Sequence, residues 1–338
     1  MATTRVVVHG GPMKTGTTAI GAYFSAAHQA GILPSDVVYP SGDLWFPAAG
    51  SITKHGQLAD YLYPNGRKKA GRKTAIQTPD NIVRKVRDLA AHVAKGRGSQ
   101  RTAVFISETL VGRANLGRLV DLLKSTFDEV IFVLAVRSPV EATQSLLVHK
   151  IKEWRSDRAD LDLYGMLQHR NGSIGYDYRR MLSQLQELPI DDFFLIPYFE
   201  DESDGYAVVD RFMKVVTGKS APRLEGDFGS RRIHPSLPLS SLKRLVALKK
   251  LKSRLRRIPF LSGVIHSLFL RILNADRSKV MRAGFNTRSS DSGDWVISPE
   301  ERARIIALYG NLGNELRKAL GPESKQAEWR SWFKATGI

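Results

Sequence analysis

The chain alternates short runs of apolar residues with longer stretches in which apolar residues recur at helical spacing. Short apolar runs are typical of strands that are buried on both faces, as in a parallel sheet covered by helices. We expect strands at residues 5–9, 102–106, 130–136 and 193–196. Strands that alternate with helices predict an α/β fold of three layers, with a central, mostly parallel sheet flanked by helices.

The helical stretches have clear starts. We expect helices over residues 17–30, 57–62, 79–94, 115–127, 139–154 and 174–188, and a last one from 298 to about 320. Pro79 and Pro139 suit the first turn of a helix, where a missing N–H breaks no intrahelical bond. Ser298, which Pro299 and two glutamates follow, predicts the start of the last helix.

Two segments interrupt this alternation within what we expect to be a single domain over residues 1–338. Segment 40–73 is rich in glycine, proline and aromatic residues, and we interpret it as an inserted loop with a short helix. Segment 240–276 predicts an insertion of two basic, apolar helices broken at Pro259. This pair could form a lid or a dimer element, lie on an anionic membrane, or present an ordinary solvated basic face.

The composition narrows the class of protein. The 338 residues include 51 Lys and Arg against 33 Asp and Glu, a net charge of +18. Such a charge favours anionic partners, namely nucleic acid, a membrane surface, or acidic small molecules and glycans, although a basic surface alone also explains it. The absence of cysteine excludes disulfides and thiolate metal sites. With no apolar run of about 18 residues and no signal peptide before the first strand, we expect a cytoplasmic protein.

A glycine-rich loop follows the first expected strand. It consists of Gly10, Gly11, Pro12, Met13, Lys14, Thr15, Gly16, Thr17 and Thr18. A strand, a glycine turn and a helix N-terminus together form an anion cradle, because backbone N–H groups converge there and the helix dipole adds positive charge. A nucleotide P-loop has its lysine directly after the second glycine. Here Thr17 stands in that place and the lysine lies at Lys14, so the loop is P-loop-like and favours a different phosphate compound.

A second candidate anion site begins at Arg137, directly after the apolar run 131–136. A guanidinium at the end of a buried strand is costly unless it meets an anion. Ser145 lies eight residues further on, about two helical turns, and could face the same phosphate. Alternatively, Arg137 pairs with a carboxylate such as Glu141, and Ser145 lies on a polar helix face. Because ligands bind beyond the carboxyl ends of parallel strands, we expect both anion sites in one cleft.

These motifs together resemble the sulfotransferases that use 3′-phosphoadenosine 5′-phosphosulfate (PAPS). Residues 11–18 look like their 5′-phosphosulfate loop in its K-[ST]-G-T-T form, and residues 133–145 look like their 3′-phosphate element. Residues 195–201 are similar to the segment that follows, and residues 232–236 to an R-x-N-x-S segment with His234 in place of asparagine. The likeness covers about residues 5–236 and is greatest to the bacterial carbohydrate type, which is related to the heparan sulfotransferases.

The resemblance implies roles for these residues. PAPS would be held by Lys14, Thr15, Gly16, Thr17, Thr18, Arg137 and Ser145. Lys14 would stabilise the charge on the leaving phosphate, whereas Arg137 and Ser145 would hold the 3′-phosphate. The product would be 3′-phosphoadenosine 5′-phosphate (PAP), and no metal would be required. The acceptor would be a hydroxyl of a carbohydrate or glycolipid, with 40–73 as an acceptor-side loop and a possible peripheral contact with a membrane.

The transfer also needs a base for the acceptor's proton. Glu108 is the first candidate, because it comes just after the strand 102–106 and the related proteins use a glutamate. It could instead pair with Lys14 or Arg137, or cap the next helix. His55 is the second candidate, in a segment where related bacterial proteins often carry histidine, although a loop histidine is more often merely exposed.

Two rival classes stay open. A P-loop kinase would need a lysine after Gly16 and an acidic strand end for Mg²⁺, where this chain has Thr17 and Arg137. A non-enzymatic basic protein that binds nucleic acid or a membrane would account for the charge. The chain has no helix-turn-helix, zinc or RNA-recognition signature, so we expect no nucleic-acid partner.

Overall fold

The structure is a computed structural model that describes residues 3–12, 15–41, 44–45, 55, 57–62, 78–96, 100–108, 110–152, 178–199, 206–225, 241, 243–248, 251, 271, 298–322 and 326–336. The chain divides into two compact units. The first consists of 1–138, 170–233 and 309–338, and the second of 139–169 and 234–308. The first unit contains the whole sheet, while the expected single domain stays a prediction.

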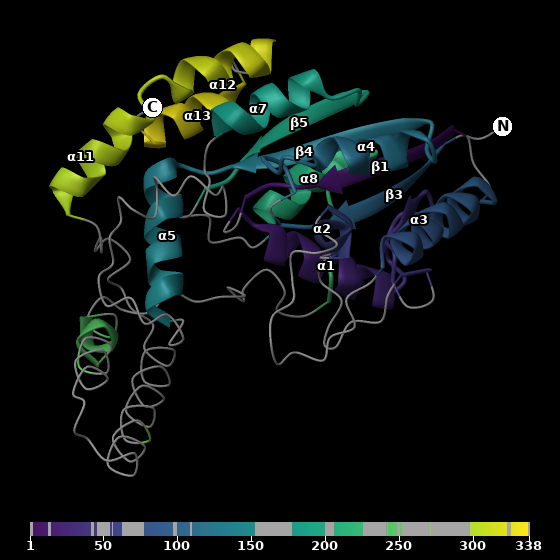
Figure 1. The fold of residues 1–338 in the computed structure, drawn as a ribbon, viewed down its shortest axis with the longest axis horizontal. Coiled ribbons are helices and arrows are strands. Elements are labelled where there is room, and N and C mark those ends of the chain that lie inside the picture. The colour runs from purple at the N-terminus through teal and green to yellow at the C-terminus, as the bar shows by residue number, and fades with distance from the viewer. Residues whose placement is uncertain are drawn as a thin grey trace. The chain divides into compact units, whose positions relative to one another are not determined.

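A five-stranded sheet forms the centre of the first unit, with β1 (Thr3–His9) as its middle strand (Figure 1). The strand order is β2-β3-β1-β4-β5, and all neighbouring strands are parallel. The other strands are β2 (Val37–Val38), β3 (Gln100–Ile106), β4 (Glu129–Val136) and β5 (Asp192–Pro197). The sheet confirms the predicted α/β class and the four predicted strands. The sequence analysis missed β2, because two residues carry no periodicity.

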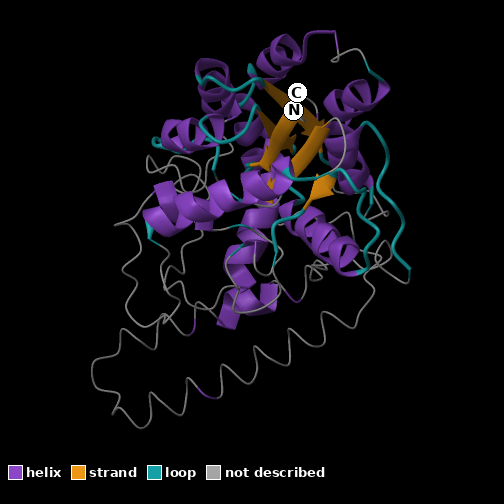
Figure 2. Cartoon of the chain, turned by 90° about the vertical axis from the view of Figure 1, so that its right-hand side faces the viewer, coloured by secondary structure: helices purple, strands orange, loops and turns teal. Residues whose placement is uncertain are grey.

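Helices cover the sheet on both faces (Figures 1 and 2). The crossover from β1 through α1 (Thr17–Gln29) leads to one edge, whereas the crossover from β3 through α4 (Leu116–Lys124) leads in the opposite direction. Because both crossovers are right-handed by rule, the two helices lie on opposite faces. The face of α1 also carries α8 (Ala207–Thr217), and its core includes Val7, Val104, Ile106, Ile131, Val133, Ala135 and Ile196 from the sheet.

The remaining helices complete the two units. The first unit also contains α2 (Gln57–Leu62), α3 (Pro79–Ala94), α7 (Tyr178–Glu187), α12 (Leu312–Leu320) and α13 (Ala327–Thr336). The described part of the second unit contains α5 (Pro139–Lys152) and α11 (Pro299–Leu308), which pack against each other. The bounds of α2 and α3 agree with the prediction, whereas α8 and α13 were not predicted.

The sequence predicted one helix from Ser298 to about Leu320, and this prediction is wrong in one respect: the structure has two helices there, α11 and α12. Its start is confirmed: the Ser298 amide donates to Glu301 Oε2 at 2.9 Å, and the Glu301 amide donates to Ser298 Oγ at 3.2 Å. The break falls at turn residues 309–311, where Gly310 disfavours a helix and Asn311 takes the N-cap position of α12.

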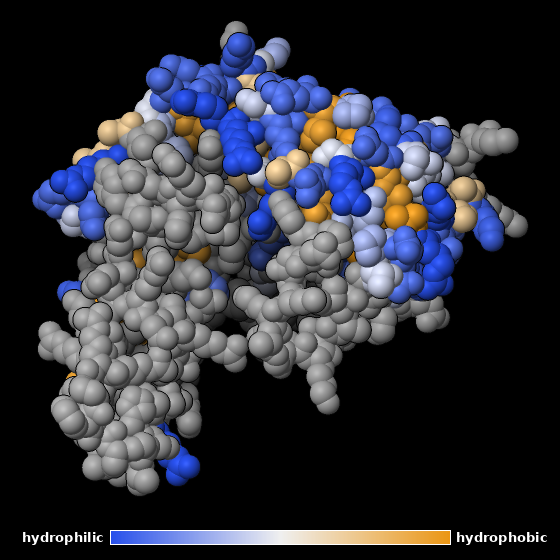
Figure 3. All heavy atoms as spheres, in the orientation of Figure 1, coloured by the Kyte–Doolittle hydropathy of each residue, from blue (hydrophilic) through white to orange (hydrophobic). Residues whose placement is uncertain are grey.

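The inserted segments lie largely outside the described residues. In 240–276 the structure describes residues 241, 243–248, 251 and 271, all helical, with Leu245 buried and Leu251 44% exposed. The interpretations of this segment therefore stay predictions. On the face shown in Figure 3, hydrophilic side chains cover most of the described surface. Within the described ranges, no helix is both long and apolar enough to cross a membrane.

Candidate functional site

The glycine-rich loop leaves β1 at the carboxyl end of the sheet. The Gly10 amide donates to the Val133 carbonyl at 3.2 Å and extends the contact between β1 and β4 by one residue. A Cβ atom on Gly11 would lie 3.3 Å from Thr15 Oγ1 and 3.5 Å from the amide nitrogen of Ala135. Glycine therefore allows the loop to pass close to β4. The buried Thr15 hydroxyl donates to the Pro12 carbonyl at 2.7 Å, which closes the loop across Met13 and Lys14.

Lys14 itself lies outside the described residues, as does Met13. Its role therefore stays a prediction. The residues on either side, Pro12 and Thr15, are held to each other, so the path of the loop on both sides of Lys14 is defined.

Gly16 begins α1 in a conformation that favours glycine. Its φ is 82°, and a Cβ atom would lie 2.9 Å from Val208 Cγ2 and 3.1 Å from Tyr198 Cε2. The first bond of the helix runs from the Ile20 amide to the Gly16 carbonyl, and the N-cap residue, Gly16, has no side chain with which to cap the preceding amides. The first turn also contains no acidic residue. The N-terminus of α1 therefore offers N–H groups and partial positive charge to an outside acceptor.

Thr17 adds a hydroxyl to this helix end. The residue is 1% exposed, and within the described part of the chain Thr17 Oγ1 has no hydrogen-bond partner. A buried hydroxyl without a partner is costly and calls for a ligand or water. Thr18 follows on the same turn and is half-buried.

The segment after β3 lies alongside the start of the glycine-rich loop. The Ser107 amide donates to the His9 carbonyl at 2.9 Å, and the Val111 amide donates to the Gly10 carbonyl at 3.1 Å. These two bonds hold the turn that contains Glu108, which is half-buried, against the loop. Ser107 is 1% exposed, and its Oγ has no hydrogen-bond partner in the described ranges. The sequence analysis assigned no role to Ser107; its position directly before Glu108 was the available signal.

The end of β4 presents Arg137, which is 3% exposed. The Arg137 amide donates to the Tyr178 hydroxyl at 2.9 Å. Its guanidinium carbon lies 5.2 Å from the centre of the Tyr198 ring, a distance typical of a cation–π contact. Tyr198 follows β5, and its amide donates to the Val136 carbonyl at 2.8 Å. A Cβ atom on Gly16 would lie 3.1 Å from a carbon of the same ring, so Tyr198 lies beside both the start of α1 and Arg137.

His55 has a different environment from the one predicted for a base. It is fully buried, and both of its ring nitrogens are hydrogen-bonded. The Ile106 amide donates to Nδ1 at 2.9 Å, while Nε2 lies 2.9 Å from the Pro40 carbonyl oxygen. Burial lowers the pKa of His55 to about 4 despite the two backbone bonds. Since Nδ1 already accepts a hydrogen bond and Nε2 must donate one, these contacts disfavour His55 as a base and favour a structural role.

The first unit thus brings together Thr15, Gly16, Thr17, Thr18, Glu108 and Arg137. Ser145 lies on α5 in the second unit, where it is half-buried. Its predicted contact with the same phosphate as Arg137 stays a prediction. Tyr198 joins the two predicted anion sites through space, a relation that the sequence analysis missed.

Comparisons with known proteins give one structural likeness to report. No family model matches the chain, and the search of curated proteins finds no match. Among solved structures, the chain is similar to a sulfotransferase from Alicyclobacillus acidocaldarius, with 14% sequence identity and a TM-score of 0.40. The match covers 82% of this chain and 97% of that one.

Proposed function

We propose that this protein is a sulfotransferase that moves a sulfuryl group from PAPS to a hydroxyl of a carbohydrate or glycolipid acceptor. One observation carries the proposal. The start of α1 at Gly16 and the buried Arg137 both lie beside the same aromatic ring, that of Tyr198: a Cβ on Gly16 would be 3.1 Å from it, and the Arg137 guanidinium carbon is 5.2 Å from its centre. Two anion-binding groups near one ring suit a nucleotide with phosphates at both ends.

The residues at the first of these groups fit a 5′-phosphosulfate. Gly16, at the N-cap of α1, has no side chain to cap the first amides, and the buried Thr17 hydroxyl has no partner within the described ranges. Glycine at position 16 lets the start of α1 pack closely against Val208 and Tyr198. Lys14 and the N–H groups of residues 15–18 would hold this end of the donor, with the Thr17 and Thr18 hydroxyls.

Arg137 and Ser145 would hold the 3′-phosphate. The guanidinium of Arg137 can make two parallel hydrogen bonds to phosphate oxygens. A kinase that uses ATP and Mg²⁺ would instead require a carboxylate at such a strand end. The buried arginine therefore favours PAPS over ATP as the nucleotide.

The donor supplies a sulfuryl group on a good leaving group. The acceptor oxygen forms a bond to sulfur, while the bond between sulfur and the 5′-phosphate oxygen breaks. Glu108 takes the proton of the acceptor hydroxyl as this oxygen loses electron density. Lys14 neutralises the charge that develops on the 5′-phosphate of PAP. Positioning and charge stabilisation by the chain's own cations supply the remaining catalysis.

A transfer assay tests the proposal. Labelled PAPS is incubated with the protein and an extract of the host's envelope glycans, and transfer of label to glycan is measured. We expect turnover that Lys14→Ala abolishes with the fold intact. Arg137→Ala mainly weakens PAP affinity, and Glu108→Gln lowers turnover more than affinity. Near-normal turnover in Glu108→Gln would contradict the base assignment.

A binding experiment separates the proposal from the kinase alternative. PAP is expected to raise the thermal unfolding temperature without magnesium, because the cations of the chain bind its phosphates. ATP is expected to compete poorly. Stabilisation by ATP with magnesium, and none by PAP, would overturn the proposed function.

A further inference from the structure

His55 completes the buried edge of β3 next to the site. In a strand, the N–H and the C=O of one residue point to the same side. On the edge side of Ile106, the His55 amide donates to the Ile106 carbonyl at 2.6 Å, and the Ile106 amide donates to His55 Nδ1 at 2.9 Å. A single residue thus supplies both bonds that a neighbouring strand would supply, one through its backbone and one through its side chain.

The hydrogen bonds from His55 continue the pairing along β3 beyond the point where β2 ends. The β2 strand pairs with β3 only at Thr102 and Ala103. Ile106, the last residue of β3, would otherwise present its backbone groups to the interior without a partner, which is costly. On the opposite side of the same strand, the Ser107 amide is bound by the His9 carbonyl. The end of β3 is therefore held from both sides, immediately before Glu108.

The histidine is itself held rigidly. The Ile106 amide can only donate and the Pro40 carbonyl can only accept, so the ring is neutral, with its proton on Nε2 and the lone pair of Nδ1 as the acceptor. The ring centres of Tyr39, Trp45 and Phe105 lie 5.0, 5.5 and 5.2 Å from that of His55. Packing among these rings, together with the two hydrogen bonds, favours this orientation of the imidazole.

We propose that His55 is a positioning residue, which acts through Ile106 to hold Glu108 where it meets the acceptor hydroxyl. This inference rests on the proposed function, because it assumes that Glu108 is the base. The physical reason is that proton transfer requires hydrogen-bond geometry, and a shift of the base by about 1 Å lowers the rate about 100-fold. His55 itself exchanges no proton with substrate.

Two substitutions separate positioning from packing. Asparagine places an amide oxygen where His55 Nδ1 lies, so His55→Asn keeps an acceptor for the Ile106 amide. Glutamine places its amide group near the position of Nε2, so His55→Gln keeps the bond to Pro40 and loses that acceptor. Both variants lose the contacts with the aromatic rings to a similar extent. We expect both to be less stable than the wild type, and we expect them to differ in turnover.

The first measurement is kcat with PAPS and a saturating acceptor, together with PAP affinity. His55→Gln is expected to lower kcat by about 10- to 100-fold with PAP affinity unchanged, whereas His55→Asn stays within about threefold of the wild type. Hydrogen exchange at the Ile106 amide provides a second readout, expected to be at least about tenfold faster in His55→Gln alone. Equal losses of kcat in the two variants would overturn the proposal.

A double-mutant cycle with Glu108 gives a test that does not depend on the behaviour of either histidine variant alone. If His55 acts through Glu108, then His55→Gln lowers kcat by less than about threefold in the Glu108→Gln background. A full further loss in that background would assign His55 a merely structural role. Absence of any transfer by the wild type would instead contradict the proposed function, and the Ile106 exchange rates would still report on the hydrogen bond.

Discussion

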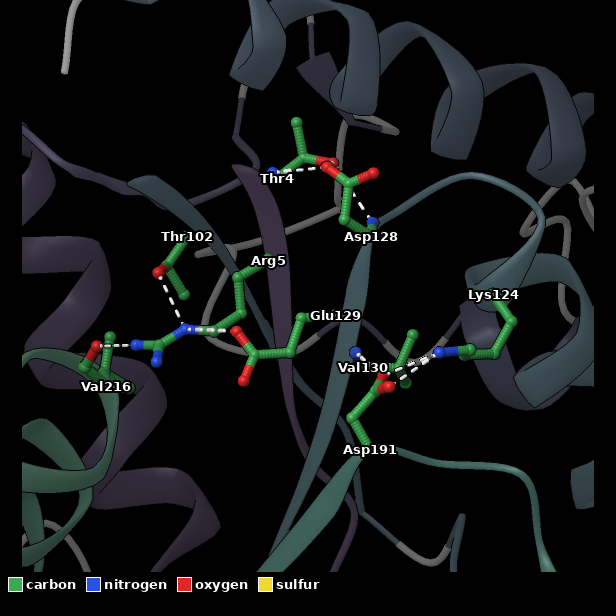
Figure 4. Close-up of polar contacts among 9 residues, drawn as sticks. All are labelled: Thr4, Arg5, Thr102, Lys124, Asp128, Glu129, Val130, Asp191 and Val216. Atoms are coloured by element: carbon green, nitrogen blue, oxygen red, sulfur yellow. Dashed lines mark hydrogen bonds and ion pairs between the residues drawn. The ribbon is translucent and has the colours of Figure 1, made fainter. Parts of the chain in front are cut away.

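The two ends of the parallel sheet differ in how their polar groups are satisfied. At the amino end, every polar side chain drawn in Figure 4 has a partner within the protein. The Thr4 hydroxyl donates to Asp128 at 2.8 Å, and Lys124 donates to both oxygens of Asp191 at 2.8 Å. Arg5 donates to Thr102 Oγ1 at 3.1 Å and to the main-chain oxygen of Val216.

At the carboxyl end, two buried hydroxyls lack such a partner among the described residues. They are Thr17 Oγ1 and Ser107 Oγ, and the N-cap residue of α1, Gly16, has no side chain to cap the helix. Since buried polar groups are normally satisfied, the carboxyl end bears a cost that a ligand can offset. At the amino end, Arg101 Nε is also buried without a partner in the described ranges, so the difference between the ends lies in their hydroxyls. We expect the amino end to serve stability and the carboxyl end to serve binding, as is usual for open parallel sheets.

The largest expected effect is a loss of folding stability at low pH. Titratable groups at the two ends of the sheet cause this loss in different pH ranges. The unfolded chain protonates His55 near its ordinary pKa of 6.5, whereas the folded chain does so only near a pKa of about 4. The unfolded state therefore binds more protons between these values, and the free energy of unfolding falls by about 3 kcal/mol as the pH drops through this window. Denaturant titrations at several pH values measure this loss.

The carboxylates at the amino end of the sheet affect stability in a lower pH range, where they become protonated. Hydrogen bonds from Thr4 hold the pKa of Asp128 below its ordinary value. Burial raises the pKa of Asp191, but bonds from Lys124 and the Val130 amide outweigh it, and the net shift is downward. Their stabilisation is present above pH ~4 and is lost as the pH falls below it. An unchanged loss between pH 6.5 and 4 in His55→Asn would contradict the assignment of that window to His55.

Gly16→Ala is expected to damage the carboxyl end most directly. A methyl group there would contact Val208 at 2.9 Å and Tyr198 at 3.1 Å, in a conformation with φ of 82°. The start of α1 must shift, and we expect PAP affinity to fall about 100-fold, measured by calorimetric titration. Gly31→Ala is the matched control, because Gly31 has φ of 67° near the other end of α1 and nothing within 4 Å of its Cβ position. Equal losses of affinity in the two variants would contradict this explanation.

Thr17→Val tests the hydroxyl without a partner. The change removes a buried polar group and keeps the shape of the side chain, so the free energy of unfolding should stay the same or rise by up to about 1 kcal/mol. PAP affinity should fall about tenfold, because the ligand loses one hydrogen bond to a charged group. At the opposite end of the sheet, Thr4→Val should show the reverse, with lower stability and unchanged affinity. A destabilised Thr17→Val with full affinity would refute the comparison.

Asp191→Asn is expected to have the smallest effect. It weakens the contact with Lys124 and is expected to lower the free energy of unfolding by about 1 kcal/mol. PAP affinity should not change, since the residue lies at the end of the sheet away from the glycine-rich loop. Asp121→Asn removes the same charge from an exposed position on α4 and serves as the control. Thermal unfolding and PAP titration of both variants provide the measurement.

The apolar pattern predicted the parallel sheet because buried strands and amphipathic helices leave a periodic signal. The short strand β2 has no such signal, and the break between α11 and α12 depended on Gly310 within an otherwise helical stretch. The glycine-rich loop and the position of Arg137 were predicted, because a charged or glycine residue at the end of an apolar run stands out.

The environments of His55 and Tyr198 could not be predicted in the same way. The rings that enclose His55 belong to Tyr39, Trp45 and Phe105, and their meeting depends on the path of the chain through space. The position of Tyr198 beside Gly16 and Arg137 likewise brings together residues far apart in the sequence. The sequence pattern indicated His55 as a candidate residue. Its packing among three aromatic rings, which the pattern does not reveal, favours a structural role.

The short length of β2 has a consequence for self-association. An open strand edge is a template on which a second molecule can add a strand, and proteins commonly protect such edges against aggregation. Beyond Ala103, the last residue that β2 pairs, the backbone of Ile106 is already occupied by His55. Because His55 and Ile106 are both fully buried, the imidazole closes this part of the edge from within the protein, and the backbone of Ile106 is not available to a strand of another molecule.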